Sequence, residues 1–338
     1  MVMWLKPNHY DSDVVISTRV RLARNAAKTP FPHMLPPTGQ EKIKQMAKDA
    51  FLKGNSDFVY YDVKDLSPAE KMQMVEKHVA SRDLVNRQSS GLIISRDESI
   101  SIMLLEEDHF RLQCIRSGLD LEGTYDIIKQ IDRMLQKEVE YAYDEQFGYL
   151  TACPTNVGTG LRASVMVHLP GLVGTGLINQ IATSIGRLGY TVRGYYGEGS
   201  QGNGDIYQVS NDVTLGHREE EILQSLKAIV NSIIQQERKA RQTIVKDNPA
   251  GQKDRVMRAY GLLKNAYMMG SQEATQLLSI MNLAQACEAE VQIDPVTLYG
   301  LMMDVKPAMI MGAENLSQQE RDIKRAEMLR RYIITNER

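Results

Sequence analysis

Strand-like stretches occur only before residue 211, and from residue 219 onward the sequence has helical periodicity almost throughout. A break at Asp247-Asn248-Pro249-Ala250-Gly251 separates a helix at 219–245 from the helices that follow. We expect those helices at 254–268, 271–289, 294–303 and 317–333. This pattern predicts an α+β fold, with an antiparallel sheet flanked by helices and then an all-α region. We place the domain boundary near residue 240, which gives domains 1–240 and 241–338.

The sheet is expected from stretches that are rich in β-branched and apolar residues with a period of two. In residues 14–24 the alternation puts Arg19 and Arg21 on one face and Val20 and Leu22 on the other. Two arginines on one face suit a polyphosphate, although a solvated strand face is the simpler interpretation. Further strands are expected within 91–117, 148–168, 190–196 and 205–210, and flanking helices at 39–53, 67–82, 118–143 and 177–188.

The composition is that of a globular protein: of 338 residues, 43% are hydrophobic and 24% charged, which is enough chain for two domains. The net charge of −2 gives no overall field that would attract nucleic acid or a membrane, so an anion site must be a local cluster of arginines. Cys114, Cys153 and Cys287 are widely spaced, which indicates a reducing compartment and argues against a disulfide framework or a closed zinc site. Since we find no signal peptide and no long apolar run, we expect a cytoplasmic protein.

Residues 148–168 combine two glycines with a cysteine and an arginine between strand-like flanks. Gly158 and Gly160 allow backbone amides to approach a phosphate closely, and Arg162 suits its oxygens. Cys153 lies beside this turn, an electropositive setting that is typical of reactive thiols. A hairpin turn with a buried cysteine is the alternative, since short glycine motifs recur by chance.

Two other stretches present carboxylates. The run Glu106-Glu107-Asp108 stands between two apolar strands, and it is either a plain acidic turn or a set of carboxylates at a sheet rim that face a cationic substrate. The run 197–204 contains four glycines and Glu198, and we expect it to be a mobile active-site loop.

In the last predicted helix, Arg321 and Arg325 are four residues apart on one face, with Asp322 beside them. This pattern indicates either an exposed charged helix or a small anion pocket. His78, near the end of the helix predicted at 67–82, is by itself more typical of a surface or packing histidine than of a ligand.

Five motifs occur in this order: Ser17-Thr18-Arg19-Val20-Arg21, Glu106-Glu107-Asp108-His109-Phe110-Arg111, Cys153-Pro154-Thr155-Asn156-Val157-Gly158-Thr159-Gly160-Leu161-Arg162, Arg193-Gly194-Tyr195-Tyr196-Gly197-Glu198 and Tyr207-Gln208-Val209-Ser210-Asn211. Together they resemble the catalytic domain of the phosphagen (guanidino) kinases, such as creatine and arginine kinase, over roughly residues 10–240. The sequence begins close to the first arginine motif, so we expect it to lack the N-terminal helical domain of those kinases. That absence would open the site to arginines on protein surfaces. Its C-terminal Arg321-Asp322-Ile323-Lys324-Arg325-Ala326 is similar to a motif of the bacterial protein-arginine kinases.

The resemblance implies that ATP is held by a set of residues from several segments, namely Ser17, Thr18, Arg19, Val20, Arg21, His78, Arg111, Arg162, Ala163, Ser164, Val165, Met166, Arg193, Gly194, Tyr195, Tyr196, Gly197 and Glu198. It implies that Glu107 and Glu198 hold the substrate guanidinium and that Cys153 lies against it. It also implies an allosteric phosphoarginine pocket at Arg321, Asp322, Arg325 and Ala326.

The chemistry of these residues agrees with those roles. The sequence has neither a P-loop nor the protein-kinase motifs, so arginines 19, 21, 111, 162 and 193 would neutralise the phosphates of MgATP. A guanidinium has no free lone pair at neutral pH, so carboxylates must align one nitrogen and accept its proton. We expect Glu107 as the principal base, Glu198 as the second clamp and Cys153 as an orienting thiolate.

The sequence therefore predicts an enzyme that transfers the γ-phosphoryl of MgATP to arginine residues of proteins, with no resident metal site. The resemblance further implies regulated proteolysis of the marked proteins, a role in stress response, an activator protein, a Clp-type AAA+ protease partner and a homodimer, without nucleic acid or membrane. Three alternatives stay open: a kinase of free arginine, a non-catalytic phosphoarginine-reading regulator, and a generic nucleotide-binding module.

Overall fold

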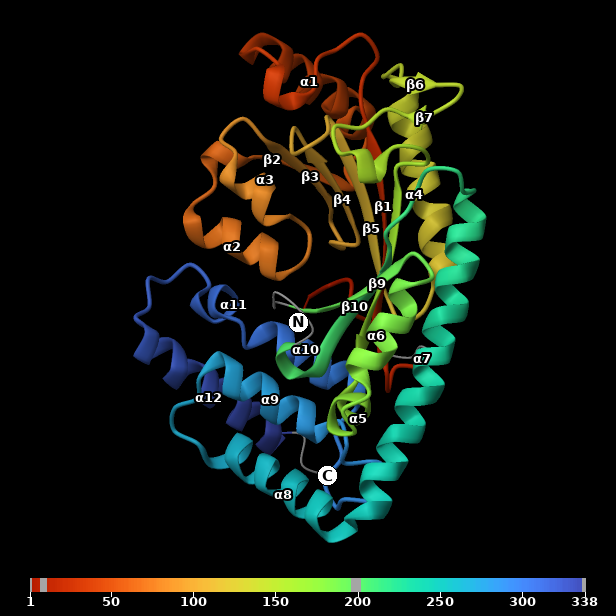
Figure 1. The fold of residues 1–338 in the computed structure, drawn as a ribbon. Coiled ribbons are helices and arrows are strands. Elements are labelled where there is room, and N and C mark those ends of the chain that lie inside the picture. Colours follow the sequence, from red (N-terminus) through yellow and green to blue (C-terminus); the bar gives the residue numbers. More distant parts are fainter. Residues whose placement is uncertain (1, 7–10, 196–201, 336–338) are drawn as a thin grey trace. The chain divides into compact units, whose positions relative to one another are not determined.

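The computed structural model of the protein describes residues 2–6, 11–195 and 202–335 (Figure 1). Contacts divide the chain into two compact units, each built from segments that are not consecutive. Unit 1 comprises Met1–Ile16, Val165–Val209 and Ala228–Arg338, and unit 2 comprises Ser17–Ser164 and Ser210–Lys227. The domain boundary near residue 240 stays a prediction.

The strands form an eight-stranded sheet in the order β2-β3-β4-β5-β1-β8-β10-β9, and β6 and β7 form a separate pair. Their bounds are β1 Val15–Arg24, β2 Phe58–Asp62, β3 Gly91–Ser95, β4 Ile100–Leu104, β5 Phe110–Ser117, β6 Tyr143–Asp144, β7 Gly148–Tyr149, β8 Leu161–His168, β9 Tyr190–Gly194 and β10 Ile206–Asn211. In unit 2, β1 pairs with β5, β2 with β3, β3 with β4 and β4 with β5, all antiparallel. The predicted antiparallel sheet is confirmed.

The sheet of unit 2 has one apolar face and one face that carries arginines. Cross-strand partners point to the same side of a sheet, and Arg21 is paired with Gln113 while Ala23 is paired with Arg111. Arg111 is also paired with Met103 on its other side. The residues between them, such as Leu112, are buried on the opposite face. We call the side of Arg21 and Arg111 the arginine face.

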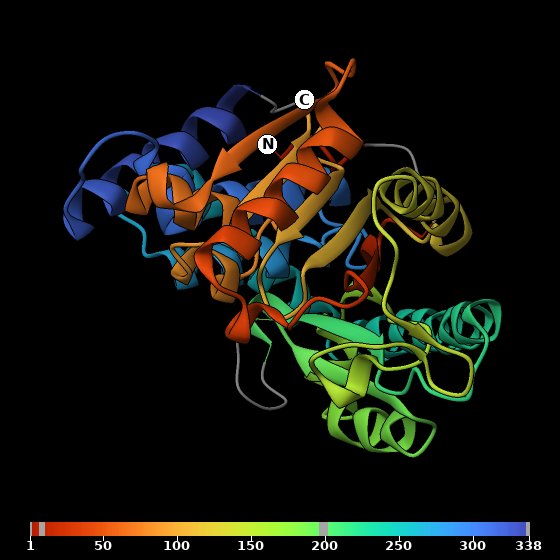
Figure 2. The ribbon, with the colours of Figure 1, turned by 90° about the horizontal axis from the view of Figure 1, so that it is seen from above.

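Helices cover both sides of this part of the sheet. The helices of unit 2 are α1 Pro37–Leu52, α2 Pro68–Glu76, α3 Arg82–Asn86 and α4 Leu121–Gln136. Helices α1 and α4 pack against each other and against the apolar face (Figure 2), because most of the residues that they bury are apolar. Helices α2 and α3 join an apolar cluster with β3 and β4 on the arginine face, through residues such as Leu84, Leu92 and Met103. The predicted start of α2 is confirmed, since Ser67 and Glu70 form a reciprocal capping box.

The helical second half is confirmed within unit 1. Its helices are α5 Pro170–Gly174, α6 Ile178–Gly186, α8 Pro249–Asn265, α9 Ser271–Met281, α10 Pro295–Asp304, α11 Pro307–Met311 and α12 Gln318–Thr335, and α7 Glu219–Asp247 precedes α8. Asn248 caps α8 by accepting a hydrogen bond from the Gly251 N–H at 3.0 Å, so the predicted break is a helix start. Helix α9 ends at Met281, earlier than expected, because residues 282–288 turn instead of continuing the helix. Among the described residues, no helix is long and apolar enough to cross a membrane.

Candidate functional site

Four arginines gather on the arginine face of unit 2, and we call them the arginine cluster: Arg19, Arg21, Arg111 and Arg162. They come from β1, β5 and β8, and β8 lies along β1 because the Ala23 N–H donates to the Gly160 carbonyl at 2.9 Å. Arg19 Nε also donates to Ser164 Oγ at 3.4 Å. Burial, followed by the charges of Arg111 and Arg162, lowers the pKa of Arg19 to about 10. The same causes, with the charge of Arg19, hold the pKa of Arg21 well below its ordinary value.

Two arginines of the cluster pair with carboxylates. Arg111 forms an ion pair with Glu106, and Arg162 Nη2 lies 3.8 Å from Asp212 Oδ1. Arg21 Nε is buried and has no hydrogen-bond partner among the described residues. Like charges at close range cost free energy that an anion recovers on binding. The cluster is therefore suited to a polyanion.

The three consecutive carboxylates lie in different surroundings, since two of them are buried and have internal hydrogen-bond donors. Glu106 is buried and accepts hydrogen bonds from Arg111 and Ser81. Asp108 is also buried, and its Oδ1 accepts from Asn25 Nδ2 and from the Ala152 N–H, both at 2.7 Å. Only Glu107 is exposed.

The pKa values of Glu106 and Glu107 shift in opposite directions. Burial would raise the pKa of Glu106, but the charge of Arg111, the hydrogen bonds from Arg111 and Ser81 and the charge of Arg21 together lower it. Partial burial, then the charges of Asp108 and Glu106, raise the pKa of Glu107. A carboxylate with a raised pKa is a better proton acceptor in its ionised form.

Cys153 lies beside Glu107. A hydrogen bond between its thiol and this carboxylate partly offsets the rise in the pKa of Glu107. Cys153 precedes the 3-10 turn Pro154–Asn156, and its Sγ lies 3.0 Å from Thr155 Oγ1. The buried-cysteine alternative does not hold, because Cys153 is only half-buried. The thiol and the exposed carboxylate thus form a pair near Arg111, whose charge also acts on Glu107.

Several other residues of the predicted nucleotide site are engaged in internal contacts. Ser17 and Val20 are buried, and Thr18 Oγ1 donates to the Gly118 carbonyl at 2.6 Å and accepts from the Asp120 N–H at 3.0 Å. The Ala163 N–H donates to Asn211 Oδ1 at 2.8 Å.

His78 is buried with a φ of 66°, and its carbonyl accepts from Gln113 Nε2 at 2.7 Å, so its backbone meets the arginine face. Arg193 lies exposed on β9 in unit 1. Unit 1 also contains the remaining predicted positions Val165, Met166, Gly194 and Tyr195. Tyr196, Gly197 and Glu198 lie outside the described residues, together with most of the predicted loop.

The structural roles of two residues were not predicted from the sequence. Glu106 forms an ion pair with Arg111, and Arg24 is a buried arginine whose Nη2 lies 3.0 Å from Asp132 Oδ2. The Arg24 guanidinium also lies over the Tyr149 ring, 3.6 Å from its centroid, and donates to the Thr159 carbonyl at 3.0 Å. Its partners Asp132 and Thr159 are 100 or more residues away in the sequence, so no local pattern indicates its structural role.

In the C-terminal motif, Arg325 is buried and hydrogen-bonded within unit 1. This side chain is 1% exposed, and it donates to the carbonyls of Val305 and Met269, both at 2.7 Å, and to Asp322 Oδ1 at 2.5 Å. Ala326 is buried as well. Arg321 is half-buried, and its Nη1 donates to the Leu316 carbonyl at 2.8 Å.

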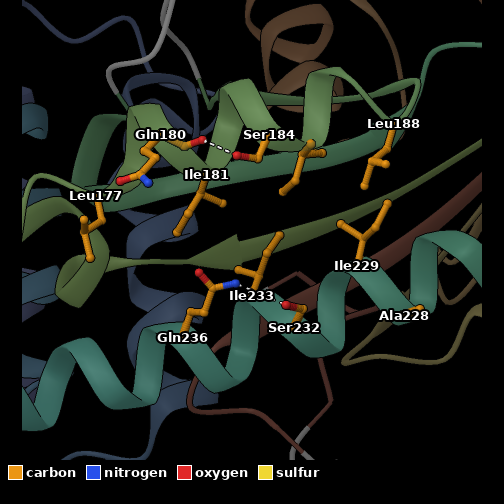
Figure 3. Close-up of a pocket in the computed structure, with 11 residues that line it drawn as sticks. Leu177, Gln180, Ile181, Ser184, Leu188, Ala228, Ile229, Ser232, Ile233 and Gln236 are labelled. Atoms are coloured by element: carbon orange, nitrogen blue, oxygen red, sulfur yellow. Dashed lines mark hydrogen bonds between the residues drawn. The ribbon is translucent and has the colours of Figure 1, made fainter.

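A second concave surface, in unit 1, has different chemistry. A groove of about 600 Å³ lies between α6 and α7 (Figure 3). Its lining includes Leu177, Ile181, Leu188 and Ile233, and its polar side chains are the uncharged Gln180, Ser184, Ser232 and Gln236. Because the lining contains no charged residue, this groove is unsuited to a triphosphate.

Comparisons with known proteins agree with the geometry. Residues 40–240 match the family model "ATP:guanido phosphotransferase, C-terminal catalytic domain", and residues 250–338 match "Protein-arginine kinase McsB C-terminal domain". The chain is 44% identical to a protein-arginine kinase of Caldanaerobacter subterraneus subsp. tengcongensis, over 96% of this chain and 97% of that protein. It is 42% identical to a protein-arginine kinase of Bacillus cereus strain AH187, over 98% and 95% of the two chains.

Solved structures give the same fold. Lombricine kinase superposes with a TM-score of 0.60 at 25% identity, over 70% of each chain. The duplicated taurocyamine kinase of Schistosoma mansoni gives a TM-score of 0.60 at 24% identity, over 69% of this chain and 34% of that one. With the sheet, the arginine cluster and both family matches in agreement, the chain is an ATP-dependent guanido phosphotransferase and belongs to the protein-arginine kinase family.

Proposed function

We propose that the protein transfers the γ-phosphoryl group of MgATP to the guanidinium of arginine residues in proteins. The observation that carries this proposal is the arginine cluster beside the pair of Glu107 and Cys153, within one compact unit. A cation-rich surface binds the phosphates, and the exposed carboxylate receives the substrate cation. Identity of more than 40% to protein-arginine kinases, over nearly the full chain, supports a protein substrate.

In the proposed mechanism the arginine cluster holds the triphosphate and stabilises the charge that develops on the transferring group. Arg111 is kept in place by Glu106, so it is preorganised. Glu107, in its ionised form, hydrogen-bonds the guanidinium, aligns one nitrogen with the γ-phosphorus and accepts the proton that this nitrogen loses. Cys153 orients the guanidinium from the side. Arg193 and Glu198 enter this mechanism on the motif match alone, as a fifth phosphate ligand and a second carboxylate clamp.

Mg²⁺ belongs to the proposal as part of MgATP. Among the described residues, no group of three or more His, Cys, Asp or Glu side chains is arranged to hold a metal ion. Mg²⁺ is commonly bound through substrate phosphates with few protein ligands, so this donor set fits an ion that arrives with the nucleotide. The ion would add positive charge at the phosphates.

The wider role comes from the resemblance of the sequence motifs, and it is part of the proposal. We infer that the phosphorylated proteins are marked for regulated proteolysis by a Clp-type AAA+ protease, that stress-response regulators are among them, and that an activator protein takes part, in the cytoplasm. We also infer a homodimer and an allosteric phosphoarginine site at Arg321, Asp322, Arg325 and Ala326. Exposed apolar side chains on and after α8, such as Leu262 and Tyr267, support a protein contact there.

Phosphosite mapping tests the proposal. The protein is incubated with MgATP and a mixed protein substrate, and peptides are analysed under conditions that preserve the acid-labile N–P bond. We expect phosphoarginine on protein substrates, and we expect Glu107→Gln to lower kcat by about 10²–10⁴-fold, the range of a general base, while ATP still binds. The matched control is Glu138→Gln, which makes the same carboxylate-to-amide change at an exposed residue after α4. An unchanged rate in Glu107→Gln contradicts its role, and phosphate on other residue types contradicts the function.

A second candidate is a kinase of free arginine or of another small guanidino compound. The structural similarity to lombricine kinase and taurocyamine kinase favours it. Rates with free arginine and with a protein substrate, measured side by side, separate the two candidates. Equal or faster phosphorylation of free arginine would favour the small-molecule kinase.

A further inference from the structure

Asn25 lies between the segment that carries Glu107 and the segment that carries Cys153. It directly follows the last residue of β1, and its side chain is buried. Both segments and Asn25 belong to unit 2. Asn25 is in none of the five sequence motifs, so its place in the site is visible only in the structure.

The Asn25 amide holds the turn that carries Glu107. Asn25 Oδ1 accepts a hydrogen bond from the His109 N–H at 2.8 Å, and Nδ2 donates to Asp108 Oδ1 at 2.7 Å. The turn itself is closed by the Leu105 N–H, which donates to the His109 carbonyl at 3.0 Å. Because Glu107 lies within this turn, Asn25 restricts the position of its backbone.

The same amide holds the segment that leads to Cys153. Asn25 Nδ2 also donates to the Leu150 carbonyl, at 3.0 Å. Asp108 Oδ1, which accepts from Asn25, accepts from the Ala152 N–H as well, at 2.7 Å. The oxygen and both hydrogens of one amide are therefore engaged, and they join two segments that are 44 residues apart at Asp108 and Ala152.

The two segments meet at Glu107 and Cys153. The thiol and the carboxylate form a hydrogen bond, which requires the segments to keep a fixed separation. The side chains of Asp108 and His109 are buried, so water cannot easily replace the bonds that they or their backbone make to Asn25. Buried polar groups that lose a partner cost free energy, and this cost keeps the network in one arrangement.

We propose that Asn25 is a positioning residue for phosphoryl transfer, which sets the separation between the Glu107 carboxylate and the Cys153 thiol. This inference rests on the proposed function, which assigns both groups to the acceptor guanidinium. Asn25 acts on the reaction through its hydrogen bonds to the two segments and not by contact with the reacting atoms.

Substitutions at Asn25 test its effect on the reaction. Asn25→Asp keeps the shape and an acceptor for the His109 N–H, but it removes both donors and places a second carboxylate against Asp108. We expect kcat to fall about 10- to 100-fold, the order of effect of a displacement of about 1 Å near reacting groups. The affinity for MgATP should change little, because the arginine cluster is unchanged. Asn25→Ser, which adds no charge and is too short to replace the amide, should act in the same direction.

The matched control is Asn282→Asp in unit 1. It makes the same change at a buried asparagine, whose Oδ1 accepts from Arg241 Nη1 at 3.3 Å. We expect this variant to keep the kcat of the parent.

The alkylation rate of Cys153 gives a second measurement, which needs no substrate. Cys114 and Cys287 are buried and Cys153 is half-buried, so a thiol reagent should modify Cys153 first in the folded protein. A thiol that donates to a carboxylate must give up this hydrogen bond to become the reactive thiolate. At mildly alkaline pH we expect Cys153 to react several-fold faster in both Asn25 variants than in the parent, with Cys114 and Cys287 still unmodified by peptide mapping.

The outcomes separate this inference from the proposed function. An unsubstituted protein that forms no phosphoarginine contradicts the proposed function, whereas the alkylation rates still test the role of Asn25. In an active protein, Asn25 variants that match Asn282→Asp in kcat contradict this inference alone. It is also wrong if kcat falls while the alkylation rate of Cys153 is unchanged, or if all three cysteines react together because the variants unfold.

Discussion

The arginine cluster of unit 2 and the buried Arg325 of unit 1 use the same side chain in opposite ways. In the cluster, burial and then the repulsion from neighbouring guanidinium groups depress the pKa values of Arg19 and Arg21. Arg325 donates to two carbonyls and one carboxylate of its own unit. The first arrangement concentrates positive charge that an anion would neutralise, whereas Arg325 already has internal acceptors.

This difference distinguishes arginines that bind an anion from arginines that stabilise the fold. An arginine with internal acceptors stabilises the fold, and its removal leaves buried acceptors without a donor. An arginine that is surrounded by other positive charges destabilises the protein when no ligand is bound, and it favours the binding of an anion. Substitutions of Arg21 and of Arg325 should therefore change stability differently.

The largest effect is expected for Arg325→Gln. This change leaves the carbonyls of Val305 and Met269 and the carboxylate of Asp322 without their shared donor. We expect a loss of about 3–5 kcal/mol in the free energy of unfolding, as for other broken buried pairs, measured by denaturant titration. The control is Arg331→Gln on the same helix, where an exposed arginine is 2.9 Å from Glu327 and should matter little. If Arg325→Gln is as stable as the parent, Arg325 does not stabilise the fold and the contrast with the arginine cluster is wrong.

The next effect concerns Arg21→Gln in the cluster. We expect a loss of about 10²–10³-fold in kcat, the cost of removing one preorganised donor to developing charge. Without nucleotide, the same variant should be unchanged or more stable by up to about 1 kcal/mol, because a repelling charge is gone. Thermal unfolding with and without MgATP measures both quantities. Arg116→Gln is the control, since Arg116 is an exposed β5 arginine paired with Asp120 at 2.7 Å. Lower stability of Arg21→Gln without nucleotide would contradict the electrostatic argument.

A smaller effect is expected on the pH dependence of activity. The charge of Asp108 helps to raise the pKa of Glu107, and Glu107 acts in its ionised form. Activity should therefore fall on the acid side at a higher pH than an ordinary glutamate would give. In Asp108→Asn the pKa of Glu107 falls because one neighbouring negative charge is removed, so this acid limit should move to lower pH. Profiles of kcat/KM against pH measure the shift, with Asp126→Asn on the exposed face of α4 as control. A shift to higher pH would contradict this assignment.

The smallest stability effect is expected for Arg321→Ala. Its side chain is half-buried and makes one hydrogen bond to the Leu316 carbonyl, so we expect a loss of at most about 1 kcal/mol. If the allosteric proposal is right, the dose–response of activity to phosphoarginine should nevertheless change. This variant tests the allosteric site more cleanly than Arg325→Ala, which combines ligand effects with unfolding. Identical dose curves for variant and parent would limit the motif to a structural role.

Much of this protein followed from local sequence patterns. The alternation in β1, the capping box of α2 and the helical second half are confirmed because period and capping depend on neighbouring residues. The order of the motifs indicated the family, which the comparisons confirm. The sequence also singled out Glu107 and the arginine cluster, because their residue types are the ones that phosphoryl transfer to a guanidinium requires.

Only the tertiary structure decided what each of these charged side chains does. Glu106, Glu107 and Asp108 are adjacent and chemically alike, yet two of them are buried with internal donors and one is exposed. Arg24 and Arg325 became structural arginines through acceptors that are distant in the sequence. The physical reason is that desolvation and pairing depend on what surrounds a charge in space, whereas a sequence pattern specifies only what lies beside it in the chain.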